Sequence, residues 1–148
     1  MAGNRLHYLT PNDWILIQAK TTRHTFKLGE EIIRQGDWGD SIYIIRRGEA
    51  SVELAGSATR AIVASLGPND ICGEIAFLEQ SKASAAVVAM EEEVEVEKIS
   101  AHELRKILEA FPRLASRFYQ SLALVMAQRL KATSGELARE MGLRDRHE

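Results

Sequence analysis

Residues 25–99 consist of short segments rich in isoleucine, valine and tyrosine that are repeatedly interrupted by glycine. These segments are too short to be helices, and turn-forming residues lie between most of them, so each is predicted to be a β-strand. Such regular spacing is typical of a closed or rolled antiparallel sheet, and it predicts a mainly β domain. The predicted strands are residues 31–34, 41–47, 50–55, 60–66, 85–89 and 94–99.

Helix-start signals flank this β region on both sides. Thr10 is suited to cap a helix and Pro11 to occupy its first position, which predicts an N-terminal helical region over residues 10–24. After the last strand, Ser100 and Glu103 have the spacing of a capping box, so a short helix is expected to begin there. The predicted fold class is therefore mainly β, of the α+β type, because helices flank the strands at both ends.

A long amphipathic helix is predicted over residues 114–133, where apolar residues recur at helical spacing without glycine or proline. With the short helix it completes a C-terminal helical region, residues 100–133. A second capping signal around Gly135 predicts that the helix breaks there and that residues 134–148 form a short last turn and a tail. No internal repeat divides the chain, so residues 1–148 are predicted to be one domain.

The overall charge and the cysteine content restrict the environment of the protein. With a net charge of −2 and a pI near 6.1, the chain lacks the global basic field that attracts nucleic acid or anionic lipid. Cys72 is the only cysteine, which excludes an internal disulfide and fits a reducing compartment, so a cytoplasmic location is predicted. No segment has the length and apolarity of a membrane span, and the N-terminus has no secretory pattern.

The sequence carries no arrangement of side chains that indicates catalysis. Nothing resembles a nucleophile with a partnered base, and an enzyme on the related cupin barrel would need a histidine-carboxylate metal cluster. The chain is therefore predicted not to be an enzyme and to need neither a metal nor a cofactor. The histidines are scattered, with no other ligand at a metal-binding spacing: His7, His24, His102 and His147.

The most informative local pattern lies at residues 67–78, where a turn and a short strand lead into Gly73 and Glu74, which open one helical turn. The start of a helix presents unpaired N–H groups and a partial positive charge, and a glycine lets a ligand approach the backbone. A phosphate is therefore predicted on the amides of Ile75 and Ala76. A carboxylate beside a phosphate is favourable only if it accepts hydrogen bonds from hydroxyl groups, so Glu74 indicates a ribose. A ribose together with a phosphate indicates a nucleotide.

Three segments together carry a family resemblance. Residues 26–33, residues 36–45 with Gly48, and residues 67–78 resemble the cyclic-nucleotide-binding domains of bacterial catabolite-activator-like regulators, protein kinase A regulatory subunits and nucleotide-gated channels. The resemblance covers roughly residues 9–130. It implies an antiparallel β-roll of the jelly-roll type with a short cassette helix, and it implies cyclic AMP or cyclic GMP as the ligand.

In that family a glutamate at the position of Glu74 holds the ribose, and an arginine shortly downstream balances the phosphate charge. Aligned without a gap, this sequence has Ala83 at the arginine position and Ser84 after it. Unpairing a buried charge costs about 3–5 kcal/mol, so affinity is expected to fall by a factor on the order of 10² or more. The ligand is then bound weakly or is a different one. The predicted ligand-binding residues are Gly73, Glu74, Ile75, Ala76, Lys82, Ala83 and Ser84.

Lys82 is the one residue that could replace the missing arginine. It reaches that position only if the loop before it is one residue shorter than usual and an extra residue compensates further along. A lysine would also bind phosphate as a point charge rather than through a planar fork, so weaker or altered ligand choice would result.

The long C-terminal helix carries more apolar surface than one face of a β-roll needs. In the family that the sequence resembles, the corresponding helix covers the nucleotide and forms a parallel two-helix dimer seam, which implies a homodimer. The alternative is a monomer whose helix folds back on the roll. The predicted seam residues are Phe118, Leu122, Val125, Met126 and Leu130.

These features predict a regulatory module that senses a nucleotide-like ligand and moves its C-terminal helix in response. One alternative is a transcription regulator, because residues 135–143 look like the first helix and turn of a helix-turn-helix. Too few residues follow for a recognition helix, so direct nucleic-acid binding is not expected of this chain. The other alternative is a protein-interaction domain that has lost ligand binding.

Overall fold

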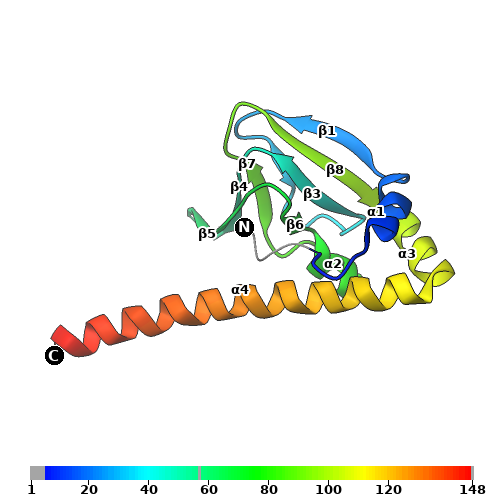
Figure 1. Ribbon diagram of the computed structural model, residues 1–148. Coiled ribbons are helices and arrows are strands. Elements are labelled where there is room, and N and C mark those ends of the chain that lie inside the picture. Colours follow the sequence, from blue (N-terminus) through cyan, green and yellow to red (C-terminus); the bar gives the residue numbers. More distant parts are fainter. Residues whose placement is uncertain (1–5, 57, 148) are drawn as a thin grey trace.

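The computed structural model describes residues 6–56 and 58–147, and two antiparallel four-stranded sheets form a β-roll in it (Figure 1). One sheet has the order β1(Thr22–Phe26), β8(Val94–Ser100), β3(Ser41–Arg47), β6(Ile71–Cys72). The other has the order β2(Glu31–Ile33), β7(Ala86–Ala89), β4(Ala50–Ala55), β5(Arg60–Leu66). The predicted fold class, mainly β with an antiparallel β-roll, is confirmed.

Side chains buried between the two sheets hold the roll together. Ile45, Val94 and Val96 are fully buried and belong to the same apolar cluster as Val87 of β7. Burial of one such side chain contributes about 1.5–3 kcal/mol. The strands β3, β4 and β5 have the predicted bounds, because turn residues delimit each of them.

The N-terminal helix, α1(Pro11–Gln18), begins where predicted but ends early. Its start is fixed by a capping box, in which Asp13 N–H donates to Thr10 Oγ1 at 3.2 Å and Thr10 N–H donates to the Asp13 carboxylate at 2.9 Å. The predicted helical region 10–24 is too long, because β1 begins at Thr22 and pairs with β8. This edge strand is exposed along most of its length and lacks the apolar alternation that reveals a strand.

The last helix, α4(Pro112–His147), passes through the predicted break. Thr133 Oγ1 donates to the Arg129 carbonyl one turn earlier at 3.1 Å, so the hydroxyl is used inside the helix and not as a cap. Gly135 costs about 1 kcal/mol relative to alanine, which a helix of this length tolerates. The predicted tail over 134–148 is therefore wrong as far as His147, and Glu148 lies outside the described residues. The helix-turn-helix interpretation of 135–143 is also wrong, because no turn interrupts the helix there.

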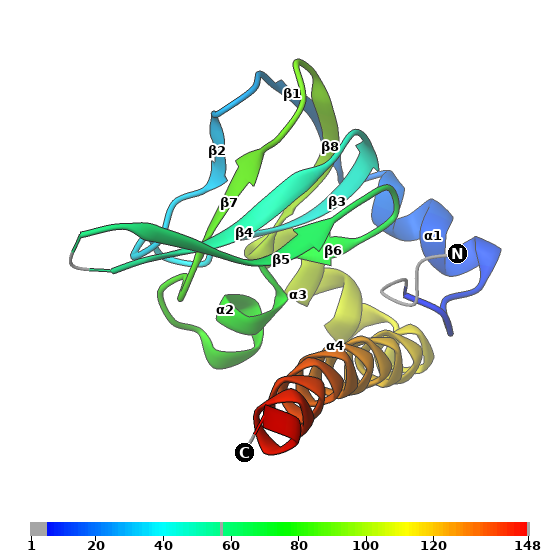
Figure 2. The same cartoon turned by 90° about the vertical axis from the view of Figure 1, so that its left-hand side faces the viewer.

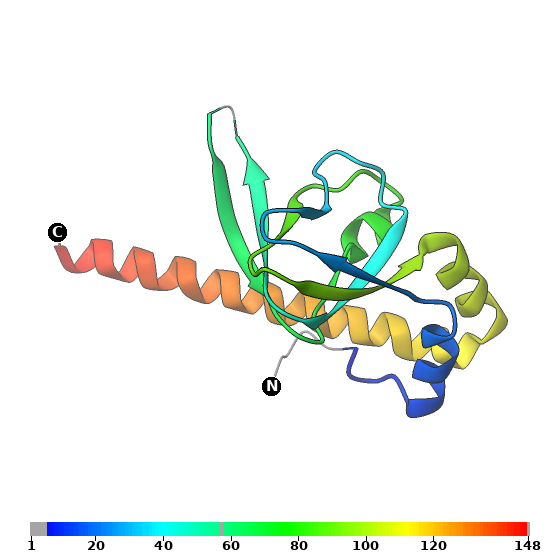
Figure 3. The ribbon, with the colours of Figure 1, turned by 90° about the horizontal axis from the view of Figure 1, so that it is seen from above.

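The helices surround one side of the roll. Helix α1, α3(Ala101–Ala110) and the first turns of α4 lie together at one end, and α2(Glu74–Glu79) lies between the roll and α4 (Figures 1 and 2). The C-terminal half of α4 extends past the sheets (Figure 3). In the described part of the chain, no helix combines the length and the apolarity that crossing a bilayer requires.

Candidate functional site

The predicted anion site is built as a strand, a left-handed glycine and a short helix. Strand β6 pairs with Tyr43 and Ile44 of β3, which brings Gly73 to the edge of the roll. Gly73 has a φ of 87°, and a Cβ on it would lie 2.8 Å from the Ser41 carbonyl oxygen. Only glycine satisfies both conditions without strain, so it fixes the direction in which α2 starts.

A second glycine sets the position of α2 from the other side. A Cβ on Gly39 would lie 2.3 Å from the Cβ of Ala76, so the loop before β3 touches the cassette helix directly. Within α2, Ala76 and Phe77 are buried, whereas Ile75 is 45% exposed. The amides predicted to receive a phosphate therefore belong to a helix that is held on two sides.

Glu74 is buried beside an arginine that lies far away in the sequence. Its side chain is 4% exposed, and its Oε1 accepts a hydrogen bond from Arg129 Nη1 of α4. Arg129 Nη2 also donates to the Ile71 carbonyl at 2.6 Å. The other oxygen, Glu74 Oε2, is buried and has no hydrogen-bond partner among the described residues. Burial raises the pKa of Glu74, and the charge of Arg129 opposes that shift.

Arg129 is the site residue that the sequence did not reveal. No guanidinium was expected at this pocket because position 83 is alanine, yet Arg129 supplies one from 55 residues further along than Glu74. A signal for it was present, because Arg129 follows Leu122 and Val125 at helical spacing on a buried stripe. A cation on such a stripe requires a partner, since an unpaired buried charge is costly.

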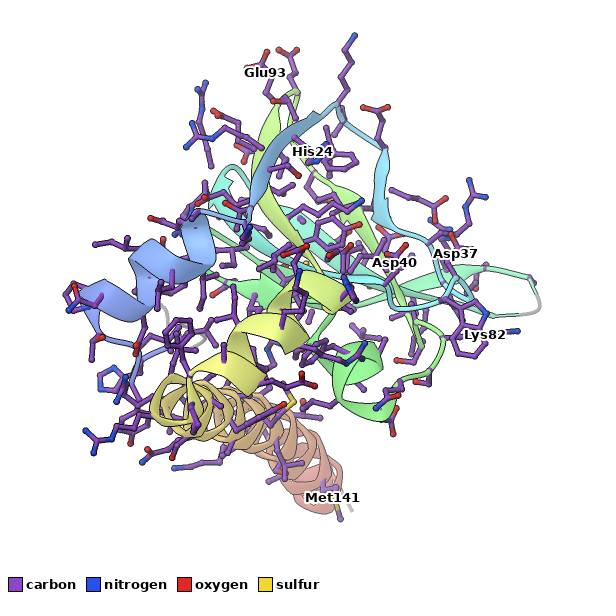
Figure 4. All side chains as sticks on the ribbon, turned by 90° about the vertical axis from the view of Figure 1, so that its right-hand side faces the viewer. His24, Asp37, Asp40, Lys82, Glu93 and Met141 are labelled. Atoms are coloured by element: carbon purple, nitrogen blue, oxygen red, sulfur yellow. The ribbon has the colours of Figure 1, made fainter. Side chains whose placement is uncertain are left out.

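Among the described residues, the three predicted ones beyond α2 make no hydrogen bond or ion pair with Glu74 or Arg129. Ala83 exchanges backbone hydrogen bonds with the loop before β3, donating to the Asp37 carbonyl at 2.7 Å and accepting from Gly36 at 2.9 Å. Ser84 is exposed. Lys82 is also exposed, and its ammonium lies 5.9 Å from the centroid of the Trp38 ring. Figure 4 shows Lys82 near Asp37 at the outer edge of the molecule.

Helices α3 and α4 both contact the C-terminal part of α2. The Arg105 guanidinium of α3 lies 4.9 Å from the centroid of the Phe77 ring, and its Nη2 donates to the Phe77 carbonyl at 3.4 Å. On the other side, Phe77 meets Phe118 of α4 edge to face with the centroids 6.3 Å apart. A displacement of α2 would therefore change contacts with both C-terminal helices, α3 and α4.

The predicted dimer seam requires a correction. Phe118, Leu122 and Val125 are at most 2% exposed and lie in the core of the protomer, because their face of α4 covers the end of the roll. Met126 is partly buried against the same core. Of the five predicted residues, Leu130 presents the most surface, with 67% of it exposed.

A wide, open hollow of the described surface lies elsewhere. It has a volume of about 1380 Å³, opens at the tip of the roll around Gly48 and residues 90–93, and includes none of the predicted ligand-binding residues. The candidate site is therefore defined by the buried Glu74–Arg129 pair and the start of α2, and not by the size of a cavity.

Known proteins resemble this chain in sequence across the region that contains this site. The sequence profile of the cyclic nucleotide-binding domain matches residues 23–111. Cyclic GMP-binding protein C of Dictyostelium discoideum is 30% identical over 142 residues, which cover 90% of this chain and 5% of that protein. The cyclic AMP receptor protein of Thermus thermophilus is 28% identical over 141 residues, which cover 93% of this chain and 62% of that protein.

A solved structure extends the comparison to three dimensions. A cyclic nucleotide-binding domain from Methylobacillus flagellatus has a TM-score of 0.81 at 18% identity, covering 89% of this chain and 74% of that chain. At this identity the likeness concerns the fold. This chain also spans less than two thirds of the length of both curated relatives.

Proposed function

Because this chain belongs to the cyclic nucleotide-binding domain family, we propose that it is a non-enzymatic regulatory module whose ligand acts on α4. The observation that carries the proposal is Glu74 Oε2, a buried acceptor without a partner among the described residues. Such an unsatisfied acceptor costs about 1–3 kcal/mol, and a ribose hydroxyl would satisfy it. The names of the two relatives refer to cyclic GMP and cyclic AMP, so both are candidate ligands.

The phosphate of the ligand is proposed to lie on the amides of Ile75 and Ala76. Support comes from the left-handed Gly73, which leaves the first turn of α2 free of a side-chain cap. Binding is proposed to be weak, because Ala83 carries no charge and the Arg129 guanidinium is already engaged by Glu74 and the Ile71 carbonyl. The Glu74–Arg129 pair has no net charge, so the amides alone face the phosphate.

The signal is proposed to leave the site through Arg129. A hydroxyl that binds Glu74 changes the environment of the carboxylate that Arg129 holds, and Arg129 is part of α4. The free energy of ligand binding thus depends on the position of α4, and such a difference between conformations is what a population shift requires. Arg105 provides a parallel contact from Phe77 to α3.

A homodimer remains part of the proposal, with a different seam from the predicted one. Leu130 is 67% exposed and Met141 is 55% exposed, and their separation of 11 residues brings both to one side of a straight helix. Exposed Ala123 and Ala127 precede them on this side and would allow close approach of a second α4. A cytoplasmic location is also proposed, in keeping with the free thiol of Cys72.

Calorimetric titration with cyclic AMP and cyclic GMP tests the ligand. Wild type is expected to bind one of them more weakly than micromolar, and Ala83→Arg is expected to gain on the order of 10² in affinity because it restores a fork beside the phosphate. Ala19→Arg, which adds the same charge at the exposed end of α1, should leave binding unchanged. Micromolar binding by wild type would contradict the weak-site proposal.

The same titration separates ligand sensing from an interaction domain that has lost its ligand. If neither wild type nor Ala83→Arg binds either nucleotide while both remain folded, the ligand-sensing proposal fails. Sedimentation of wild type against Leu130→Glu tests the seam independently. We expect Leu130→Glu to be monomeric at concentrations where wild type and Leu28→Glu are dimeric, and a monomeric wild type would refute the dimer.

A further inference from the structure

A second hollow lies where α1 meets the corner between α3 and α4. Figure 1 shows these elements at the end of the molecule opposite to the C-terminus of α4, so this surface is separate from the proposed dimer seam. The hollow has a volume of about 390 Å³, within the range of pockets that hold a ligand group. Its lining residues are Asp13, Leu16, Arg117 and residues 110–114.

The walls of this hollow are apolar and partly open. Leu16 on α1 is 36% exposed and Phe111 at the corner is 44% exposed, while Leu114 beneath them is buried. The wall formed by α1 is firmly attached, because Asp13 accepts hydrogen bonds from Arg117 Nε at 2.7 Å and from Arg117 Nη2 at 2.8 Å. A fixed, partly exposed apolar groove suits the anchoring of a partner's apolar side chain, because little of it must be ordered on binding.

The charges around the groove determine which sign of charge the partner should carry. Both oxygens of Asp13 are used, by Arg117 and by the Thr10 N–H, so a basic partner finds no free carboxylate in the lining. The donors on Arg117 Nη1 are not used by any described residue. Arg113 is exposed, and no carboxylate of the described residues lies within ion-pairing distance of it. The groove therefore offers unpaired donors and positive charge, which match a carboxylate.

We propose that this groove docks a partner protein segment in which a large apolar side chain lies within one helical turn of an aspartate or glutamate. The apolar side chain would lie between Leu16 and Phe111, and the carboxylate would meet Arg113 and the free donors of Arg117. This inference does not depend on the ligand proposed for the cassette.

A displayed library of random dodecapeptides, selected on the immobilised full chain, tests the proposal. Enriched peptides should combine leucine, isoleucine or phenylalanine with an acidic residue at close spacing. When such a peptide is made with lysine in place of its acid, fluorescence anisotropy should show affinity lower by about tenfold or more. Arg113→Glu and Phe111→Ser should each weaken binding of the acidic peptide to a similar extent. Both changed side chains are exposed, so the fold should persist.

Two matched substitutions on the loop between β1 and β2 serve as controls. Lys27→Glu repeats the charge reversal and Leu28→Ser repeats the loss of an exposed apolar side chain, and both should bind as wild type does. Circular dichroism confirms that each variant is folded. The proposal is overturned if no peptide is enriched, if the enriched peptides lack an acidic residue, or if they bind the folded groove variants as tightly as wild type.

Discussion

Removing the Arg129 side chain should leave a buried carboxylate without its counter-charge. In Arg129→Ala, Glu74 keeps its buried position but loses the hydrogen bond and ion pair on Oε1, while Oε2 has no partner to begin with. The loss of one member of a buried pair costs about 3–5 kcal/mol. Because the Arg129 side chain is 28% exposed, solvent screens part of this loss and brings the cost to the lower end of the range or just below it, so we expect about 2–3 kcal/mol at pH 8.

The cost should depend on pH with a defined sign. Burial already raises the pKa of Glu74, and loss of Arg129 removes the charge that opposes this rise, so the folded pKa of the variant lies further above the unfolded value of about 4.3. A group whose pKa is raised on folding contributes stability that is complete below its unfolded pKa and is lost as the pH rises through its folded pKa. The destabilisation should therefore be small at pH 4 and should grow towards pH 8.

Urea unfolding of wild type, Arg129→Ala, Glu74→Gln and the double variant at pH 4, 6 and 8 measures this effect. At pH 8 the cycle should give a coupling free energy of about 2 kcal/mol, because the neutral amide that replaces the carboxylate in the double variant leaves no buried charge unpaired. Arg139→Ala, an exposed truncation on the same helix, should change stability by less than about 0.5 kcal/mol. A cost for Arg129→Ala that is the same at all three pH values and on the Glu74→Gln background would refute the reasoning.

Three further substitutions test other parts of the fold. Gly135→Ala should slow amide hydrogen exchange in the C-terminal half of α4 by about fivefold, because alanine is favoured by about 1 kcal/mol in a helix interior and nothing crowds the new Cβ; unchanged exchange would argue against a continuous helix. Asp13→Asn should cost on the order of 1 kcal/mol at pH 7, since the hydrogen bonds from Arg117 lower the pKa of Asp13 to about 2. The thermal melts of that variant and wild type should converge as the pH falls from about 4 to 2, and a constant gap would count against the pair. Gly39→Ala should cost about 2 kcal/mol or more in urea unfolding, because its Cβ would lie 2.3 Å from that of Ala76; wild-type stability would mean that α2 is not held there.

The β-roll was predictable because its signals are local. Strand β4, residues 50–55, is delimited by turn residues at both ends and pairs with its neighbours on both sides, so composition and punctuation suffice to find it. Strand β1 is different. It is an edge strand that pairs only with β8, and its exposed residues carry no alternation, so nothing local distinguishes it from the end of a helical region.

The wrong break in α4 has a physical origin in competition between local signals. Thr133 and Ser134 followed by Gly135 and Glu136 have the composition of a new helix start, and the same threonine side chain can instead donate to the carbonyl one turn before it. Which of the two hydrogen bonds forms depends on whether the helix already runs through this region. The packing of Phe118 and Leu122 against the core fixes the helix that leads into this region, and both residues lie outside the sequence window that contains the capping pattern.

The residues of the site likewise divide into those with local sequence signals and those without. Gly73 and Glu74 could be found because strand, glycine and helix start are contiguous, whereas Arg129 reaches Glu74 across 55 residues. The alanine at position 83 predicted a pocket without a guanidinium, because the family's arginine comes from the segment shortly after the cassette helix. A long helix packed across the roll can deliver a guanidinium from a position far outside the cassette.

Two arginines of α4 hold carboxylates, and their positions define how this helix could transmit a signal. Arg117 holds Asp13 near the start of the helix, and Arg129 holds Glu74 further along, at about 1.5 Å per residue or roughly 18 Å away. From Arg117 to the last described residue the helix extends for roughly 45 Å. If Arg117 acts as the pivot, a shift of about 1 Å at Arg129 becomes about 2.5 Å at the far end, provided that the helix is rigid. Gly135 and Gly142 lie between Arg129 and that end, so they are positions where the helix is easily deformed and where a small change at Glu74 could be lost before it reaches a partner.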